Sequence, residues 1–266
     1  MTESTTPGAT ATDRRQPPRG GLDAIAPLTP NAWLRFDLVG RMLPAGIGDV
    51  LEIGCGQGAL GARLSLRYRY LGVEPDPESY GVAARRVARI GGTGEVRNVT
   101  VESLGDRRFD LVCAFEVLEH IEDDAAAVTG WASRLRPGGW LMLSVPAHQH
   151  RFGPADRMAG HFRRYDPEVM TGLLSRCGFT DIDVRQYGVP LGYVLEAARN
   201  AVGRRRVAQQ ANLSIEERTA GSGRLLQPSG GGYGSAARWG TAPFRLAQRA
   251  FPGAGTGLVV RARLAG

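Results

Sequence analysis

The sequence predicts an α/β fold with a doubly wound, mostly parallel sheet. Short apolar runs alternate with stretches of helical periodicity up to about residue 187, and glycines follow the first apolar run in GDVLEIGCGQG (48–58). A short, continuous apolar run is typical of a strand that is buried on both faces. Because alternating strands and helices form parallel sheets, the two observations together favour this architecture.

The expected elements follow one another along the chain. A leading helix covers 31–43, where apolar residues recur at roughly helical spacing. The apolar runs predict strands at 48–53, 69–74, 95–101, 109–114, 139–145 and 180–187. The segments between them predict helices at 58–67, 77–90, 122–135 and 166–177. Helix 122–135 has acids in its first turn, arginines in its last and Pro-Gly-Gly beyond, which matches the helix dipole and predicts a stop.

Two ligands compete for the glycine turn. The pattern G-x-G-x-x-A that starts at Gly54 fits a dinucleotide loop only loosely. Glu74, twenty residues later, can accept hydrogen bonds from both hydroxyls of a ribose, which NAD and adenosyl ligands share. Glu52 would repel a pyrophosphate but could pair with an ammonium or sulfonium group. The turn therefore favours S-adenosylmethionine over NAD.

Three later segments strengthen that choice. They read GVEPD (72–76), FDLVCAFEVLEHI (109–121) and RLRPGGWLMLSV (134–145). Together with LEIGCGQG (51–58), they resemble the successive motifs of class I S-adenosylmethionine-dependent methyltransferases, from about Trp33 to about Tyr187. FEVLEH is similar to the small-molecule branch, which includes ubiquinone-type O-methyltransferases. The resemblance implies a Rossmann-like sheet of seven strands, S-adenosyl-L-methionine as the methyl donor and S-adenosyl-L-homocysteine as the product.

The resemblance also implies which residues contact the donor. They lie in the glycine turn and after the second, third and fourth strands: Glu52, Gly54, Cys55, Gly56, Gly58, Glu74, Pro75, Val101, Glu102 and Phe115. One departure concerns the adenine. Where the family often has an aspartate after the third strand, this chain has Thr100, Val101 and Glu102. The resemblance therefore supports the ribose contacts more firmly than the adenine contacts.

A long insertion separates the last two predicted strands. The family usually returns with an antiparallel seventh strand soon after the sixth, but here GLVVRARL (257–264) comes about 70 residues later. We therefore expect four parts: a disordered tail at 1–28, a methyltransferase core at 29–187, an insertion at 188–256 and a final core strand at 257–266. An amphipathic pattern opens the insertion. We interpret the insertion as a cap over the acceptor site, with a surface excursion or a membrane-surface helix as alternatives.

All four histidines fall at the predicted edge where the parallel strands end. Open α/β sheets bind ligands at this edge, and methyl transfer to a hydroxyl needs a group that takes the proton. His120 lies four residues after Glu116, so a helical turn would let the carboxylate orient a catalytic imidazole. His148 and His150, after the fifth strand, are alternative bases. Each histidine could instead have a capping or packing role.

The segment HFRRY (161–165) is the candidate acceptor-binding loop. Arg163 and Arg164 could hold a carboxylate or phosphate, with His161 and the ring of Tyr165 beside them. An ion-pair cluster that fixes the loop is the alternative.

A metal ion is a further possibility in the FEVLEH segment. The quinone-type relatives imply that Glu116, Glu119 and His120 could bind a divalent cation. Because compact acid–histidine clusters are common without metals, we predict no metal site.

Charge and hydropathy limit the partners. All 33 basic residues are arginines and the formal net charge is +7, which we interpret as solvated surface charge, with an anionic partner as the alternative. Residues 115–118 lack the [DNS]PP[YFW] tetrapeptide of nucleic-acid amino-methylases, so we expect no nucleic-acid partner. The sequence shows no signal segment and no apolar run of about 18 residues. This predicts a cytoplasmic protein without stable membrane association.

The combined prediction is an S-adenosylmethionine-dependent methyltransferase of a small-molecule acceptor. O-methylation is favoured over C- or N-methylation, secondary metabolism is the expected setting, and a homodimer is compatible with the insertion. A peptide or lipid acceptor and a noncatalytic adenosylmethionine-binding protein stay open as alternatives. Glu52 counts against an NAD-dependent enzyme.

Overall fold

The computed structural model describes residues 27–207 and 231–266, with side chains described except at 206–207 and 231–235. Most of the predicted disordered tail therefore lies outside the described residues. Leu28, at the end of that tail, is buried.

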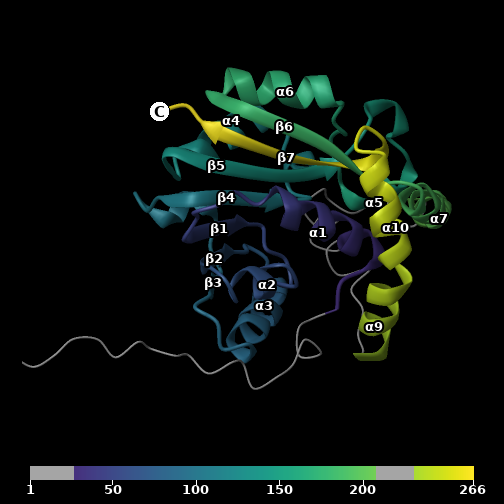
Figure 1. Cartoon of the computed structure of the whole chain (residues 1–266), viewed down its shortest axis with the longest axis horizontal. Coiled ribbons are helices and arrows are strands. Elements are labelled where there is room, and N and C mark those ends of the chain that lie inside the picture. The colour runs from purple at the N-terminus through teal and green to yellow at the C-terminus, as the bar shows by residue number, and fades with distance from the viewer. Residues whose placement is uncertain (1–26, 208–230) are drawn as a thin grey trace, which may run out of the picture.

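A seven-stranded sheet forms the centre of the molecule, in the order β3-β2-β1-β4-β5-β7-β6 (Figure 1). Its strands are β1 (Asp49–Ile53), β2 (Arg69–Val73), β3 (Glu95–Arg97), β4 (Phe109–Phe115), β5 (Leu135–Pro146), β6 (Phe179–Gly188) and β7 (Gly255–Leu264). The first five strands pair in parallel, and β7 runs antiparallel between β5 and β6. The predicted doubly wound, mostly parallel sheet with an antiparallel last strand is confirmed.

Helices cover both faces of this sheet. One face carries α1 (Pro30–Met42), α2 (Gly61–Leu64) and α3 (Pro77–Arg89), and the other carries α4 (Asp124–Ala132) and α6 (Pro167–Arg176). Because successive strand residues point to opposite faces, Val50 packs in the first core and Leu51 in the second. Both side chains are fully buried, as expected for a parallel strand at the centre of a sheet.

Two predicted elements are shorter in the structure. The helix expected at 58–67 is reduced to the four residues of α2, because the chain before it is still turning at Gly58, which has φ 72°. The strand expected at 95–101 ends at Arg97, and a 3₁₀ turn follows at Val101–Leu104.

The fifth strand begins earlier than predicted. Leu135 pairs with Phe109, and a register shift before Leu111 accommodates the Pro-Gly-Gly segment inside β5. The prediction that this segment stops the preceding helix is wrong, since α4 already ends at Ala132.

The insertion between β6 and β7 is helical where it is described. It contains α7 (Leu191–Val207), α9 (Gly231–Gly240) and α10 (Ala242–Ala247). α7 packs on α5 (Pro154–Ala159), while α9 and α10 pack on α1. Figure 1 shows these helices beyond one end of the sheet. No helix in the described ranges is long and apolar enough to cross a membrane.

Candidate functional site

The turn after β1 depends on glycines in the left-handed region. Gly54, Gly56 and Gly58 have φ values of 64°, 54° and 72°, which are unfavourable for residues with a Cβ. A Cβ on Gly54 would lie 2.8 Å from Cγ2 of Val117, in the FEVLEH segment after β4. The glycine turn and the FEVLEH segment are therefore in direct contact.

Glu74 clamps this turn from the end of β2. Its Oε2 accepts a hydrogen bond from the Gly56 backbone N–H at 2.8 Å, and its Oε1 accepts one from Asp76 at 2.9 Å. Burial raises the pKa of Glu74, although these two hydrogen bonds act in the opposite direction. A carboxylate offers about four lone-pair sites, so Glu74 can still accept hydrogen bonds from ribose hydroxyls.

Glu52 is a buried carboxyl group beneath the turn. It is 3% exposed, and the Tyr70 hydroxyl donates a 2.6 Å hydrogen bond to its Oε2. Burial raises the pKa of Glu52 to about 7, against the opposing effects of Tyr70 and Arg35. The group therefore changes charge close to neutral pH.

The remaining predicted donor contacts surround this turn. Cys55, Val101 and Phe115 are buried, whereas Pro75 and Glu102 are exposed. Asn98, which the sequence analysis missed, donates hydrogen bonds to the backbone oxygens of Glu74 and Pro75 at 2.8 and 3.0 Å. Asn98 lies in the segment after β3, and no motif points to it.

Glu116 does not orient the imidazole of His120, although its spacing suggested this role. It has φ 58°, and the only helical turn that follows is the 3₁₀ turn Leu118–His120, so the expected shared helix face is wrong. Glu116 Oε1 instead lies 3.1 Å from Arg35 and accepts a 3.0 Å hydrogen bond from Ser144. Burial favours the neutral acid, but Arg35 and Ser144 outweigh it and lower the pKa of Glu116.

Glu119 is the exceptional group of the segment. It is 0% exposed, and neither carboxylate oxygen has a hydrogen-bond partner among the described residues. Burial, and then the nearby Glu116, raise its pKa well above the ordinary value. Buried polar groups are nearly always paired in folded proteins, so an orphaned carboxylate indicates a position for a ligand.

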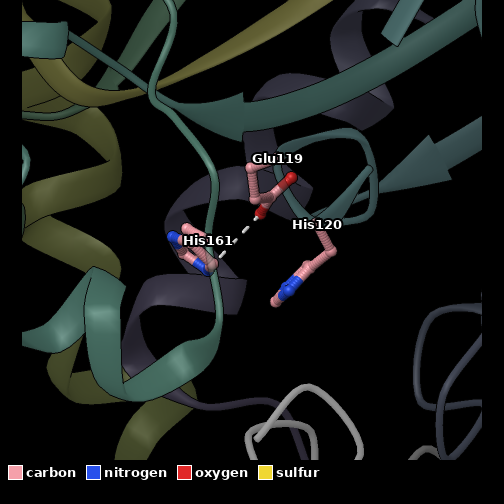
Figure 2. Close-up of side chains that lie close together, drawn as sticks. All are labelled: Glu119, His120 and His161. Carbon is pink, nitrogen blue, oxygen red and sulfur yellow. Dashed lines mark ion pairs between the residues drawn. The ribbon is translucent and has the colours of Figure 1, made fainter. Parts of the chain in front are cut away.

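Two imidazoles lie beside Glu119, as Figure 2 shows. His161 Nε2 is 4.0 Å from Glu119 Oε1, and the rings of His120 and His161 meet edge to face at 4.6 Å between centroids. Burial, followed by the repulsion of His161, lowers the pKa of His120 to about 4, so this ring is neutral at physiological pH. His161 Nδ1 is 3.0 Å from Asp156 Oδ1, which fixes its orientation. We call Glu119, His120 and His161 the acid–histidine cluster.

The acid–histidine cluster also has the donor set of a metal site. One ligand atom from each residue lies within 4.8 Å of the others. A buried carboxylate without a hydrogen-bond partner and two imidazole rings suit a divalent transition metal. The described residues therefore fit the cation that the quinone-type resemblance implies, with His161 in the place that the sequence analysis gave to Glu116.

His148 and His150 form a second group with Asp166, the N-cap of α6. His148 has φ 66°, its Nε2 is 3.0 Å from Gln186 Oε1, and its Nδ1 is 3.5 Å from Asp166. His150 is exposed. Both histidines follow β5 at the edge where the sequence analysis placed them, but neither belongs to the acid–histidine cluster.

The HFRRY segment is tied to the protein by ion pairs. Arg164 is 6% exposed and binds Asp156 through two nitrogens, at 2.9 and 2.7 Å, and Glu196 of α7 at 3.0 Å. Arg163 and the hydroxyl of Tyr165 both bind Asp124, at 2.8 and 3.0 Å. These contacts favour the alternative in which the cluster fixes the loop, and they leave His161 as the residue of the segment that faces Glu119.

A comparison with known protein families identifies the family of this chain. A family model described as a methyltransferase domain matches residues 23–184, which include the glycine turn, the FEVLEH segment and His161. The chain belongs to this methyltransferase family. The resemblance to methyltransferases drawn from the four sequence motifs is confirmed.

Individual relatives agree with the family. A ubiquinone biosynthesis O-methyltransferase of Dechloromonas aromatica is 30% identical over 116 residues, which are 42% of this chain and 50% of the relative. One of the same name from Alkalilimnicola ehrlichii is 35% identical over 144 residues, 51% of this chain and 56% of the relative. The chain thus spans about half the length of these curated relatives.

A solved structure shows the same fold without fixing the chemistry. The [4+2]-cyclase SpnF superimposes with a TM-score of 0.57 at 20% identity, over 87% of this chain and 80% of that protein. The predicted Rossmann-like methyltransferase fold is confirmed. Because this structural neighbour is named as a cyclase, the reaction has to be argued from the site and not from the fold.

The hydrogen bonds of Glu74 to the backbone lead to the first testable prediction about this site. In Glu74→Ala the glycine turn and the start of α3 each lose one backbone hydrogen bond, and the ribose loses its acceptor. Affinity for S-adenosylmethionine, measured by calorimetry, should fall by about 1 to 3 kcal/mol. Glu95→Ala removes an exposed carboxylate of β3 and is the matched control. Equal affinity of the Glu74 variant and the control would contradict the assignment.

The two arginines of HFRRY make a second prediction. Arg164→Met removes the ion pairs that join the buried Asp156 and Glu196, leaving them only His161 and Arg151 as partners, so the free energy of unfolding in urea should fall by about 3 to 5 kcal/mol. Arg163→Met removes a pair in which Arg163 is 31% exposed, and should cost no more than about 1 kcal/mol. If the Arg164 variant keeps its stability but loses acceptor binding, Arg164 binds the acceptor directly.

Proposed function

We propose that this chain transfers the methyl group of S-adenosylmethionine to an oxygen atom of a small acceptor at the acid–histidine cluster. The observation that carries the proposal is Glu119, a fully buried carboxyl group without a partner among the described residues. It follows β4 in the segment whose Val117 touches the glycine turn. A base at this position would stand beside the donor.

The chemistry of methyl transfer fits such a base. The acceptor oxygen attacks the methyl carbon in line with the bond to sulfur, the carbon–sulfur bond breaks, and neutral S-adenosylhomocysteine leaves without needing a proton. The acceptor hydroxyl must lose its proton, and a general base is most effective when its pKa lies near the working pH. Burial raises the pKa of Glu119 well above its ordinary value, which makes its ionised form a stronger proton acceptor, whereas burial lowers the pKa of His120 to about 4. We therefore give the role of base to Glu119.

The two histidines then act as supports. His161 donates its Nδ1 hydrogen to Asp156 at 3.0 Å, so its Nε2, which lies 4.0 Å from Glu119, can accept a hydrogen bond from the acceptor, and neutral His120 can accept one as well. The same three residues would hold a divalent cation, which would acidify the acceptor hydroxyl. In either case the side chains align the hydroxyl and remove its proton.

The relatives support the class of acceptor. Both proteins compared are named for O-methylation in ubiquinone biosynthesis, which favours an oxygen acceptor on a small aromatic molecule. A cytoplasmic location, a homodimer, a secondary-metabolic setting and the absence of a nucleic-acid partner stay predictions of the sequence. So does a role of His148 or His150 as the catalytic base.

Replacing Glu119 tests the proposal directly. Glu119→Gln keeps the volume but removes the base, so formation of S-adenosylhomocysteine with a panel of phenols, catechols and hydroxy acids should fall by about 10² to 10⁴-fold. Affinity for S-adenosylmethionine should stay unchanged. Glu122→Gln alters an exposed carboxylate three residues away and is the control. If wild-type protein binds the donor but methylates no member of the panel, the result favours a noncatalytic adenosylmethionine-binding protein.

A pH profile tests the pairing of Glu52 with the amino group of the donor. With a pKa of about 7, Glu52 is neutral at pH 5.5 and half ionised at pH 7. Affinity for S-adenosylmethionine should therefore rise about tenfold over this range, which stays below the pKa of about 7.7 to 8.0 of an α-amino group. Glu52→Gln should bind weakly with no such rise. A wild-type profile that is flat from pH 5.5 to 7 would exclude the pairing.

A further inference from the structure

The helices of the insertion turn their polar faces toward the protein. On α7, Glu196 is 5% exposed and paired with Arg164, and Asn200 accepts a 3.0 Å hydrogen bond from the backbone of α5. Gly203 lies so close to α5 that a Cβ on it would be 2.8 Å from the carbonyl carbon of Pro154. These three residues, spaced at four and three positions, dock the body of the helix with polar groups or without a side chain, while Leu191 at its start packs on the apolar core.

The opposite face of α7 is apolar and exposed. Its exposed residues before the terminal arginines recur at helical spacing: Val194, Ala197, Ala198, Ala201 and Val202. Val194 is 65% exposed and Val202 is 47% exposed. The exposed Arg204 and Arg205 follow directly. An amphipathic helix in a globular protein normally has the reverse arrangement.

The second helical unit repeats this inversion. Thr241 continues the hydrogen bonding from α9 into α10, so the two helices present common faces. The inner face of this unit is mixed: Thr241 and Gln248 are 2% and 3% exposed, Ala237 is buried, and Phe244 packs against the core. Trp239 and Leu246, seven residues apart on the outside, are 70% and 62% exposed. Other exposed apolar residues on or beside this unit are Ala236, Gly240, Pro243, Ala250 and Phe251.

These apolar faces coincide with the positive charge of the chain. Residues 188–256 contain nine arginines and three glutamates, so six of the seven net positive charges belong to the insertion. Within its described residues the one acid, Glu196, is buried in ion pairs. Five of the seven large hydrophobic side chains that are exposed in the described chain also lie here: Val194, Val202, Trp239, Leu246 and Phe251.

We infer that the outer faces of α7 and of α9–α10 form a docking surface for a lipid bilayer that contains anionic headgroups. Valine, leucine and aromatic side chains flanked by arginines are the composition with which helices lie in a membrane interface. A second copy of the chain is a poorer occupant, because two faces of the same positive sign would meet. This surface revises the expectation that the chain has no stable membrane association. It needs no membrane-spanning helix.

Vesicle binding tests this surface without methyl transfer. The full chain, at low ionic strength, is mixed with vesicles of phosphatidylcholine alone or with 30% phosphatidylglycerol (about 30% is a usual anionic content), and the bound fraction is measured by flotation. We expect binding to the anionic vesicles only, weakening as salt is added. Val194→Ser with Val202→Ser should lower the partition coefficient about tenfold, and Trp239→Ser with Leu246→Ser at least as much.

Matched controls separate the possible results. Val169→Ser changes a valine of α6 that is 56% exposed, and should leave vesicle binding unchanged. Loss of binding in this control as well, or no binding of wild-type protein to anionic vesicles, would overturn the inference. So would concentration-dependent dimerisation that the insertion variants abolish, or binding to soluble polyglutamate as tight as binding to vesicles. Failure to bind S-adenosylmethionine would contradict the proposed function and leave this result standing.

Discussion

The close contact between the glycine turn and the FEVLEH segment is the constraint on which the site depends. β1 and β4 are neighbours in the sheet, so their ends lie side by side, and Gly54 has no Cβ to keep Val117 away. One strand end therefore supplies the turn that receives the donor, and the next supplies Glu119. Their separation is set by strand pairing, which is rigid, and not by the loops that follow.

Buried charge is distributed unequally around this contact. Glu116 is neutralised by Arg35, and Asp156 by Arg164, so their carboxylates are held in fixed positions. Glu119 is more deeply buried than either of them but has no cation at hydrogen-bond distance among the described residues. Neighbouring acids with different partners acquire different pKa values, and such a division separates a structural carboxylate from a reactive one.

Sequence reasoning predicted the sheet and the donor loop because local patterns determine both. The apolar run at 48–53 and its glycines identify a buried strand and a turn wherever they occur. The acceptor side was predicted less well. The spacing of Glu116 and His120 suggests a shared helix face, but the positive φ of Glu116 and a single 3₁₀ turn remove it.

Long-range contacts account for the rest of what the sequence could not reveal. His161 meets Glu119 only because the segment after α5 folds back across the end of β4, where Phe162 N–H binds the Glu119 carbonyl at 2.8 Å. Arg164 looks like an anion ligand in the sequence, and only the fold supplies its partners from positions 8 and 32 residues away. No short motif contains either contact.

The same ion pairs explain why the insertion presents apolar faces. Arg164 draws Glu196 inward, and a helix with one face committed to a buried charge must turn the opposite face to solvent. On α7 that opposite face carries Val194 and Val202. Arg164 also binds Asp156, which orients His161 beside Glu119. The helix that carries the outer surface of the insertion is thereby linked to the acid–histidine cluster through the side chains of Glu196, Arg164 and Asp156.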